Sequence, residues 1–136
     1  MNLFSKKKLL IATHNEGKLE EFKSMLRNLD LQLISAKDLD LSEPLEIEES
    51  FVGNARIKSM AACQAGNLPT IADDSGLEVH DLDNQPGVYT ADWAQTENGR
   101  DFKKAMEFLW NKLSSTHKRK PFTANFCCTL VLTFPS

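Results

Sequence analysis

The sequence predicts one α/β domain over residues 1–136, and three observations support that class. Residues 8–13 form a short continuous apolar run, which is typical of a strand buried on both faces. A loop and an amphipathic helix follow at once, and residues 31–35 then have the pattern of a second strand. Residues 123–134 alternate apolar and polar side chains in the clearest strand pattern of the chain. We expect that last strand to need neighbours on both sides.

Three segments have the periodicity or the boundaries of helices. The first carries an apolar stripe of Leu19, Phe22, Met25, Leu26 and Leu29. The second is expected to begin at Ser50, as its N-cap, and to run to about Ala65, because Gly66, Asn67 and Pro69 then end it. The third is expected over residues 99–113, with an apolar stripe of Phe102, Ala105, Met106, Leu109 and Leu113.

Shorter elements are expected between the second and third helices. An apolar strand over residues 69–72 runs into a polar Asp-Asp-Ser-Gly turn, and residues 77–79 continue extended. Residues 84–87 carry a second turn signal, after which residues 88–90 are expected to return as a strand.

The composition is that of an ordinary globular chain of one-domain size, with 41% hydrophobic and 26% charged residues. A net charge of −3 argues against a protein that binds a nucleic-acid backbone. The first residues lack the apolar stretch of a signal peptide, and no segment approaches a membrane span. The three cysteines, Cys63, Cys127 and Cys128, lack metal-ligand spacing, which predicts reduced core cysteines in a cytoplasmic protein.

The most informative motif is Asp73-Asp74-Ser75-Gly76, at the end of the expected strand. Carboxylates are the ligands that magnesium prefers, and one of them can also act as a base toward a metal-activated water. The glycine would allow a sharp turn and the close approach of a ligand. A plain polar turn explains the same residues equally well. The motif alone leaves both readings open.

A second motif, Thr13-His14-Asn15-Glu16-Gly17-Lys18, lies between the first strand and the first helix. A helix N-terminus offers unpaired N–H groups and the positive end of the helix dipole, which suits phosphate. The motif is not a Walker A loop, because its first glycine is missing and Leu19 follows Lys18. We favour an anion site over a simple capped helix start.

The two motifs suggest complementary chemistry at one edge of a sheet. Loops at the carboxyl ends of parallel strands meet at the same edge, where ligands bind. A phosphate loop beside a metal site predicts metal-assisted hydrolysis of a phosphoanhydride. The acidic stretch of residues 43–49 offers a further metal ligand, and Lys58 on the second helix could reach a phosphate.

Four segments, in this order, resemble the inosine triphosphate pyrophosphatase family, the non-canonical purine NTP (dITP/XTP) pyrophosphatases. They are residues 12–18, 50–55, 71–77 and 86–89. The resemblance extends from about Leu9 to Phe134 and implies a mixed central β-sheet flanked by helices, of the Maf/Ham type. It further implies a homodimer and magnesium-dependent hydrolysis of ITP, dITP or XTP to the monophosphate and pyrophosphate, which removes non-canonical purines from the nucleotide pool.

The resemblance also assigns roles to individual residues. The whole loop Thr13, His14, Asn15, Glu16, Gly17 and Lys18 would hold the triphosphate, with Lys58 as a supporting contact. Asp74 would be the metal-associated general base, Ser75 a substrate contact and Glu46 the second metal-binding acid. Physically, the metal would neutralise phosphate charge while Asp74 positions or deprotonates the attacking water.

The sequence departs from the family pattern in three places. Gly53 stands where the family usually has Glu, and Asp92 stands where many members have Arg. The Phe-Gly-Tyr-Asp and Ser-His-Arg segments with which the family recognises the base are not present, so the chain is expected to lack the family's C-terminal part.

Two other functions fit the same residues. One is a non-catalytic nucleotide-binding or dimerising fragment of such an enzyme. The other is a Maf-like nucleotide pyrophosphatase, whose general architecture is shared but whose motifs fit less well.

Overall fold

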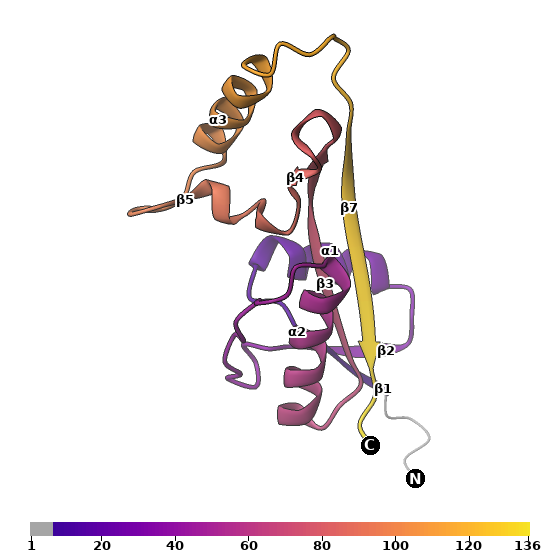
Figure 1. Cartoon of the computed structure of the whole chain (residues 1–136). Coiled ribbons are helices and arrows are strands. Elements are labelled where there is room, and N and C mark those ends of the chain that lie inside the picture. Colours follow the sequence, from indigo (N-terminus) through magenta and orange to yellow (C-terminus); the bar gives the residue numbers. More distant parts are fainter. Residues whose placement is uncertain (1–6) are drawn as a thin grey trace. The chain divides into compact units, whose positions relative to one another are not determined.

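A computed structural model describes residues 7–136 and resolves two compact units. The first unit runs to Asp74 and includes Thr129–Ser136, and the second is Ser75–Cys128. The strand β3 (Thr70–Val79) contributes to both units, which are described separately below. Figure 1 labels the elements along the chain.

The sheet is mixed, as predicted. Its strand order is β2-β1-β3-β4, and β7 (Ala124–Thr133) also pairs with β3. β1 (Lys7–Ile11) runs parallel to β2 (Leu31–Ser35) and to β3, whereas the short β4 (Gln85–Pro86) runs antiparallel to β3. The predicted strands at residues 8–13 and 31–35 are confirmed, with β1 ending two residues earlier than expected.

Small side chains let the helix α2 (Phe51–Gly66) pack closely in the first unit. Ala62 forms a core cluster with Leu10, Ala12 and Ala72, and partly buried hydrophobic residues pack against it: Ile34, Leu41 and Leu68. The Ser59 hydroxyl also donates to the Thr70 carbonyl at 3.1 Å and lies 2.6 Å from the Thr133 hydroxyl, so it ties α2 to β3 and to the end of β7. This packing fixes the helix that carries Asn54 and Lys58.

Both ends of α2 follow the predicted signals. The Ser50 hydroxyl accepts a hydrogen bond from the Gly53 N–H at 3.0 Å, as an N-cap does. Asn67, at φ +50°, donates its N–H to the Cys63 carbonyl in the left-handed conformation that ends many helices.

The helix α1 (Glu16–Leu26) buries less of its apolar stripe than predicted. Phe22 is buried and Leu19 and Leu26 are half-buried, but Met25 and Leu29 are more than half exposed. Leu29 lies beyond the end of the helix, so the helical spacing that included it does not apply.

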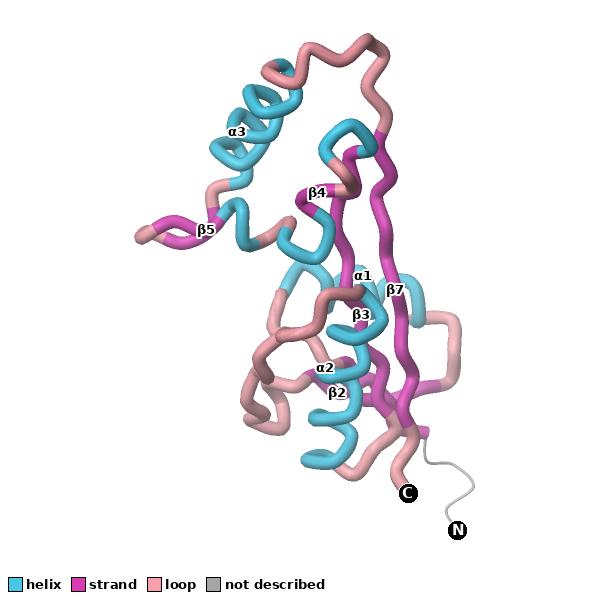
Figure 2. The backbone as a smooth tube through the Cα atoms, in the orientation of Figure 1, coloured by secondary structure: helices cyan, strands magenta, loops and turns pink. Residues whose placement is uncertain are grey.

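The Asp-Asp-Ser-Gly segment is not a turn. It lies within β3, which continues for ten residues from Thr70 to Val79, as the long strand in Figure 2 shows. The expectation of a sharp turn at Gly76 is therefore wrong. β1 pairs with β3 at Thr70 and Ile71, before this segment, and β4 pairs with it at Glu78 and Val79, after it. This tertiary pairing overrides the local turn signal.

The second unit has a core of Val79, Leu82 and Leu113, against which Leu77, Leu109 and Phe122 pack. Its short elements, in chain order, are η1 (His80–Leu82), β4, η2 (Gly87–Tyr89), η3 (Asp92–Ala94), β5 (Gln95–Thr96) and β6 (Gly99–Arg100). The turn at residues 84–87 is present, with positive φ at Asn84 and Gly87. The strand expected at residues 88–90 is absent from this part of the chain, since Gly87–Tyr89 form a 3₁₀ turn in which the Thr90 N–H and hydroxyl bond back to Gly87.

The third helix, α3 (Phe102–Ser114), begins three residues later than expected. Gly99 and Arg100 pair with β5 as a small hairpin, and the Asp101 carboxylate caps the helix by accepting from the Lys104 N–H at 3.1 Å. Within its apolar stripe Leu113 is buried, whereas Phe102 and Met106 are exposed.

The apolar face expected of β7 is present but uncovered. Phe126, Leu130, Leu132 and Phe134 are each more than half exposed. Within residues 7–136, β7 pairs with β3 only, so the second neighbour predicted for it is not found there.

Of the three cysteines, all of which lie in the described residues, only Cys63 is buried. Cys128 is exposed and Cys127 half-buried, so the core role predicted for these two is wrong. The Cys127 thiol donates to Glu78 Oε1 at 2.7 Å, and this hydrogen bond raises its pKa. In the described part of the chain, no helix combines the length and the apolar character needed to cross a membrane.

Candidate functional site

The loop between β1 and α1 is held by its own side chains. The Thr13 hydroxyl, which is buried, accepts from the Asn15 N–H at 3.2 Å. The Asn15 carboxamide in turn accepts from the Lys18 N–H at 3.1 Å and caps the helix. A side chain at Gly17 would place its Cβ 3.2 Å from that carboxamide oxygen, so glycine suits the cap. The loop therefore presents a preformed helix N-terminus, which favours an anion.

The Lys18 ammonium reaches β3. Its Nζ lies 3.0 Å from Asp73 Oδ2, and the Asp73 side chain is buried. The other oxygen, Asp73 Oδ1, is buried without a hydrogen-bond partner among the described residues. The phosphate loop and the acidic motif are thus directly connected, as the adjacent strands β1 and β3 predict.

Asp74 lies among a second group of charges. Lys58 is buried and its Nζ lies 3.0 Å from Glu46 Oε1. Both charges, together with the Asn54 side chain, act on the Asp74 carboxylate. Asn54 is itself fixed, since its carboxamide accepts from the Glu48 N–H at 2.9 Å and donates to the Glu48 carbonyl at 3.1 Å. These bonds also hold the irregular segment that carries Glu46.

The pKa of Asp74 is raised from its ordinary value. Burial is the largest cause and the nearby Glu46 carboxylate is the second, while Lys58, Asn54 and Lys18 act in the opposite direction. Asp74 Oδ2 is buried with no hydrogen-bond partner in residues 7–136. An unsatisfied buried oxygen on a carboxylate of raised pKa is typical of a base or a ligand site.

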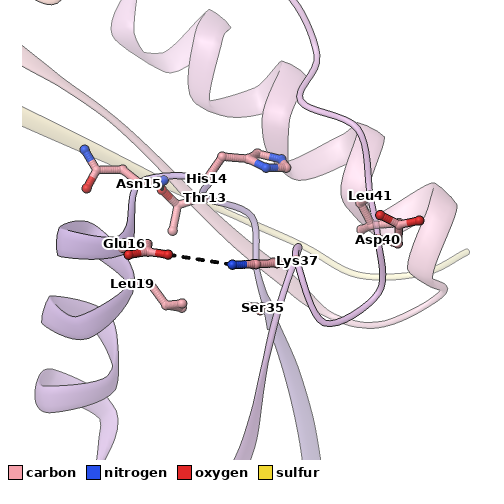
Figure 3. A pocket seen from close by; sticks show the side chains of 9 residues that line it. All are labelled: Thr13, His14, Asn15, Glu16, Leu19, Ser35, Lys37, Asp40 and Leu41. Carbon is pink, nitrogen blue, oxygen red and sulfur yellow. Dashed lines mark hydrogen bonds and ion pairs between the residues drawn. The ribbon is translucent and has the colours of Figure 1, made fainter. Parts of the chain in front are cut away.

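A hollow of about 310 Å³ adjoins the loop. Figure 3 shows the nine residues that line it: Thr13, His14, Asn15, Glu16, Leu19, Ser35, Lys37, Asp40 and Leu41. Glu16 and Lys37 face each other across it, with Oε1 3.8 Å from Nζ, and both side chains are well exposed. Ser35 donates its N–H to Asp38 Oδ2 at 2.9 Å, and the Asp38 N–H donates to the Ser35 hydroxyl at 3.0 Å. Hydrogen bonding with Ser35 lowers the pKa of Asp38.

The predicted site residues thus fall into two groups. Thr13, Asn15, Gly17 and Lys18 form the loop, while His14 and Glu16 are exposed along the hollow. Glu46, Lys58 and Asp74 come together as expected. Ser75, the next residue of β3, is half-buried at the start of the second unit.

Sequence reasoning missed Asp73 and Asn54 as site residues. The alternation of side chains along a strand could have shown that Asp73 and Asp74 point to opposite faces. Asn54 lay within a recognised motif, but its bonds to Glu48 depend on a loop path that no local pattern reveals.

No metal cage exists in the described ranges: no group of three or more His, Cys, Asp or Glu side chains is arranged to hold an ion. Two carboxylates, Glu46 and Asp74, are available instead. Magnesium commonly binds through one or two carboxylates together with water and substrate phosphates. The unsatisfied Asp74 oxygen and this donor chemistry fit such an ion.

The departure at Gly53 has a local explanation. A Cβ at this position would lie 2.7 Å from the Glu48 Cβ and 2.8 Å from the Ser50 Oγ. The helix start is therefore packed against the Glu48 segment in a way that suits glycine. Asp92, the other departure, is exposed at the start of η3.

We expect Gly53→Ala to lower the melting temperature, although alanine favours a helix by up to about 1 kcal/mol in the open. The clash would displace Glu48 and weaken the Ser50 cap, which is worth about 1 kcal/mol. Thermal unfolding followed by circular dichroism measures the effect. The control is Ala61→Gly on the exposed side of α2, which measures the helix preference of alanine over glycine without a clash. A higher melting temperature for Gly53→Ala would show that the Glu48 segment yields freely.

Comparison with known proteins identifies the family of this chain. The model of the Ham1 family matches residues 9–136. A dITP/XTP pyrophosphatase from Ruegeria pomeroyi is 51% identical over 127 residues, which cover 93% of this chain and 62% of the relative. One from Bartonella quintana is 44% identical over 135 residues, with 97% and 63% covered. The chain thus spans a little under two thirds of these relatives.

Solved structures show the same fold. A HAM1 protein from Coxiella burnetii superposes with a TM-score of 0.86 at 29% identity, over 95% of this chain and 64% of that one. The Staphylococcus aureus Ham1 protein gives 0.78 at 37% identity, with the same coverage. Since the family model spans nearly the whole sequence and the fold agrees, this chain belongs to the Ham1 family.

Proposed function

We propose that this chain carries the hydrolytic site of a pyrophosphatase that converts ITP, dITP and XTP to the monophosphate and pyrophosphate. One observation carries the proposal: buried Asp74 keeps an unsatisfied oxygen beside the Glu46–Lys58 pair, on the strand that also holds Lys18 through Asp73. The substrate class is supported by relatives at 44–51% identity that are dITP/XTP pyrophosphatases.

The chain's own residues suit three tasks. The helix N-terminus at Thr13–Lys18 binds the polyphosphate, with the Lys18 ammonium beside it. Lys58 supplies a second positive charge that offsets the anionic substrate and the two carboxylates. Asp74 orients the attacking water and accepts its proton on Oδ2, a role that its raised pKa favours.

Mg²⁺ belongs to the proposal as the metal that Asp74 and Glu46 would hold. When bound, it would neutralise charge on the phosphoryl group and lower the pKa of a bound water.

We place the protein in the cytoplasm as a homodimer that clears non-canonical purines from the nucleotide pool. The free thiols of Cys63 and Cys127 are consistent with a reducing compartment.

A second candidate is nucleotide binding without catalysis. It is supported by the Thr13–Lys18 loop, whose preformed helix N-terminus suits a phosphate whether or not hydrolysis follows. Both functions use the phosphate loop, so only turnover separates them.

The test incubates the chain with dITP, XTP, dGTP and dATP in Mg²⁺ and separates the products by ion-exchange chromatography. We expect monophosphate and pyrophosphate, formed roughly tenfold or more faster from dITP and XTP than from dGTP. Orthophosphate as the product would refute a pyrophosphatase. Binding of dITP by calorimetry without any product would favour the second candidate.

A further inference from the structure

We infer that Asp73 is a positioning residue that fixes the Lys18 ammonium at the phosphate loop and acts on phosphate only through Lys18. The inference rests on the proposed function, because it takes the Thr13–Lys18 loop as the polyphosphate site. It assigns the two adjacent aspartates different tasks, with Asp74 at the chemistry and Asp73 at substrate binding.

Strand geometry separates the two carboxylates. Successive side chains of β3 point to opposite faces, and the interactions agree with this. Asp73 pairs with Lys18 of α1, whereas the charges that act most strongly on Asp74 are Glu46 and Lys58. Lys18 thus pairs directly with Asp73, whereas Lys58 acts more strongly than Lys18 on Asp74.

Asp73 lies next to the start of the loop. The Ala12 N–H donates to the Ile71 carbonyl at 2.9 Å, so β1 and β3 are still paired one residue before Thr13. The Asp73 carboxylate is therefore anchored on a paired strand just where the loop leaves the sheet.

Lys18 is consequently held at both ends. Asn15 binds its backbone N–H at 3.1 Å, and Asp73 binds its Nζ at 3.0 Å. A free lysine side chain has many rotamers, and restraining them before the ligand arrives lowers the entropy cost of binding. The ammonium has three donors and its side chain is 31% exposed, so donors remain for a phosphate oxygen.

Simple electrostatics predicts the opposite effect. A buried carboxylate beside the loop repels phosphate, so removing its charge should tighten binding if Asp73 has no positioning role. A purely structural role predicts a third pattern, in which loss of Asp73 weakens binding to the same degree whether or not Lys18 is present. The three accounts can be separated with one ligand.

The test measures binding of inorganic tripolyphosphate to the whole chain by calorimetry without metal. The variants are Asp73→Asn, Lys18→Met and their combination, with Glu20→Gln on the exposed surface of α1 as the control. We expect Asp73→Asn to weaken binding about fivefold in the parent and less than about twofold in Lys18→Met. Asp73→Glu keeps the charge but displaces it by one methylene, and we expect an intermediate affinity.

Tighter binding by Asp73→Asn, or an equal loss with and without Lys18, would overturn the inference. Thermal unfolding of each variant identifies any that do not fold, and Asp73→Glu then decides: affinity equal to the parent would count against positioning. Failure of the parent to bind tripolyphosphate would remove the loop assignment and this inference with it. The expected coupling without hydrolysis of dITP would leave Asp73 as assigned and refute only the catalytic proposal.

Discussion

Lys58→Met is expected to destabilise the chain by about 2–3 kcal/mol, the largest stability effect among the site residues. Lys58 is buried with its Nζ 3.0 Å from Glu46 Oε1, and its charge also acts on Asp74. Methionine keeps the length of the side chain but leaves two neighbouring carboxylates without their cation. Glu46 is 36% exposed, which places the effect at or below the lower end of the range for a broken buried pair.

Urea unfolding followed by circular dichroism measures this loss. The matched control is Lys23→Met, because Lys23 and Glu20 form an exposed pair at 3.7 Å that should contribute less than about 0.5 kcal/mol. Adding Glu46→Gln to Lys58→Met should recover part of the stability, since it removes one unpaired charge. Equal unfolding midpoints for Lys58→Met and Lys23→Met would show that Lys58 is not needed to offset the carboxylates.

Asp74→Asn is expected to have opposite effects on activity and stability. Loss of the base should lower turnover by about 10²–10⁴-fold. Loss of a buried charge beside Glu46 should raise the melting temperature at pH 7. A residue whose removal stabilises the fold while abolishing turnover is retained for its chemistry.

The stability gain has a defined pH dependence. The pKa of Asp74 is raised in the folded chain, so the folded state binds its proton more tightly than the unfolded state does. The cost of the ionised carboxylate is therefore complete above the folded pKa and absent below the ordinary value of 3.8. Melting curves in EDTA should show Asp74→Asn ahead of the parent at pH 7, with the difference vanishing as the pH falls toward 3.8. A difference that grows on acidification would contradict the raised pKa.

The fold could be predicted where local pattern and tertiary packing agree. The β1 run, the strand at Leu31–Ser35 and the Ser50 cap of α2 are all confirmed, because each depends on nearby residues. The Asp-Asp-Ser-Gly turn and the strand at residues 88–90 were wrong. Pairing of β3 with strands distant in the sequence decided the backbone of the first segment. The hydrogen bonds from Thr90 to Gly87 decided the backbone of the second.

The candidate site was predicted in part for similar reasons. The rule that the carboxyl ends of parallel strands lie at one edge of a sheet predicted the loop beside the acidic motif. The parallel pairing of β1 with β3 and the Lys18–Asp73 contact agree with that prediction. Lysines on helices are ordinarily exposed, so the burial of Lys58 could not be predicted from the sequence. The nearby carboxylates of Glu46 and Asp74 explain it, because they offset its charge. The role of Asn54 could not be predicted, because its hydrogen-bonding partner Glu48 lies in an irregular segment.

Pyrophosphate release from dITP, measured for the parent and for Asp74→Asn at equal folded concentration in Mg²⁺, tests whether Asp74 is the catalytic base. We expect release by the parent and a rate at least about 100-fold lower in the variant, which remains folded and binds tripolyphosphate as the parent does. Equal rates in the two proteins, or no release by a parent that binds dITP, would contradict the assignment of Asp74 as the catalytic base.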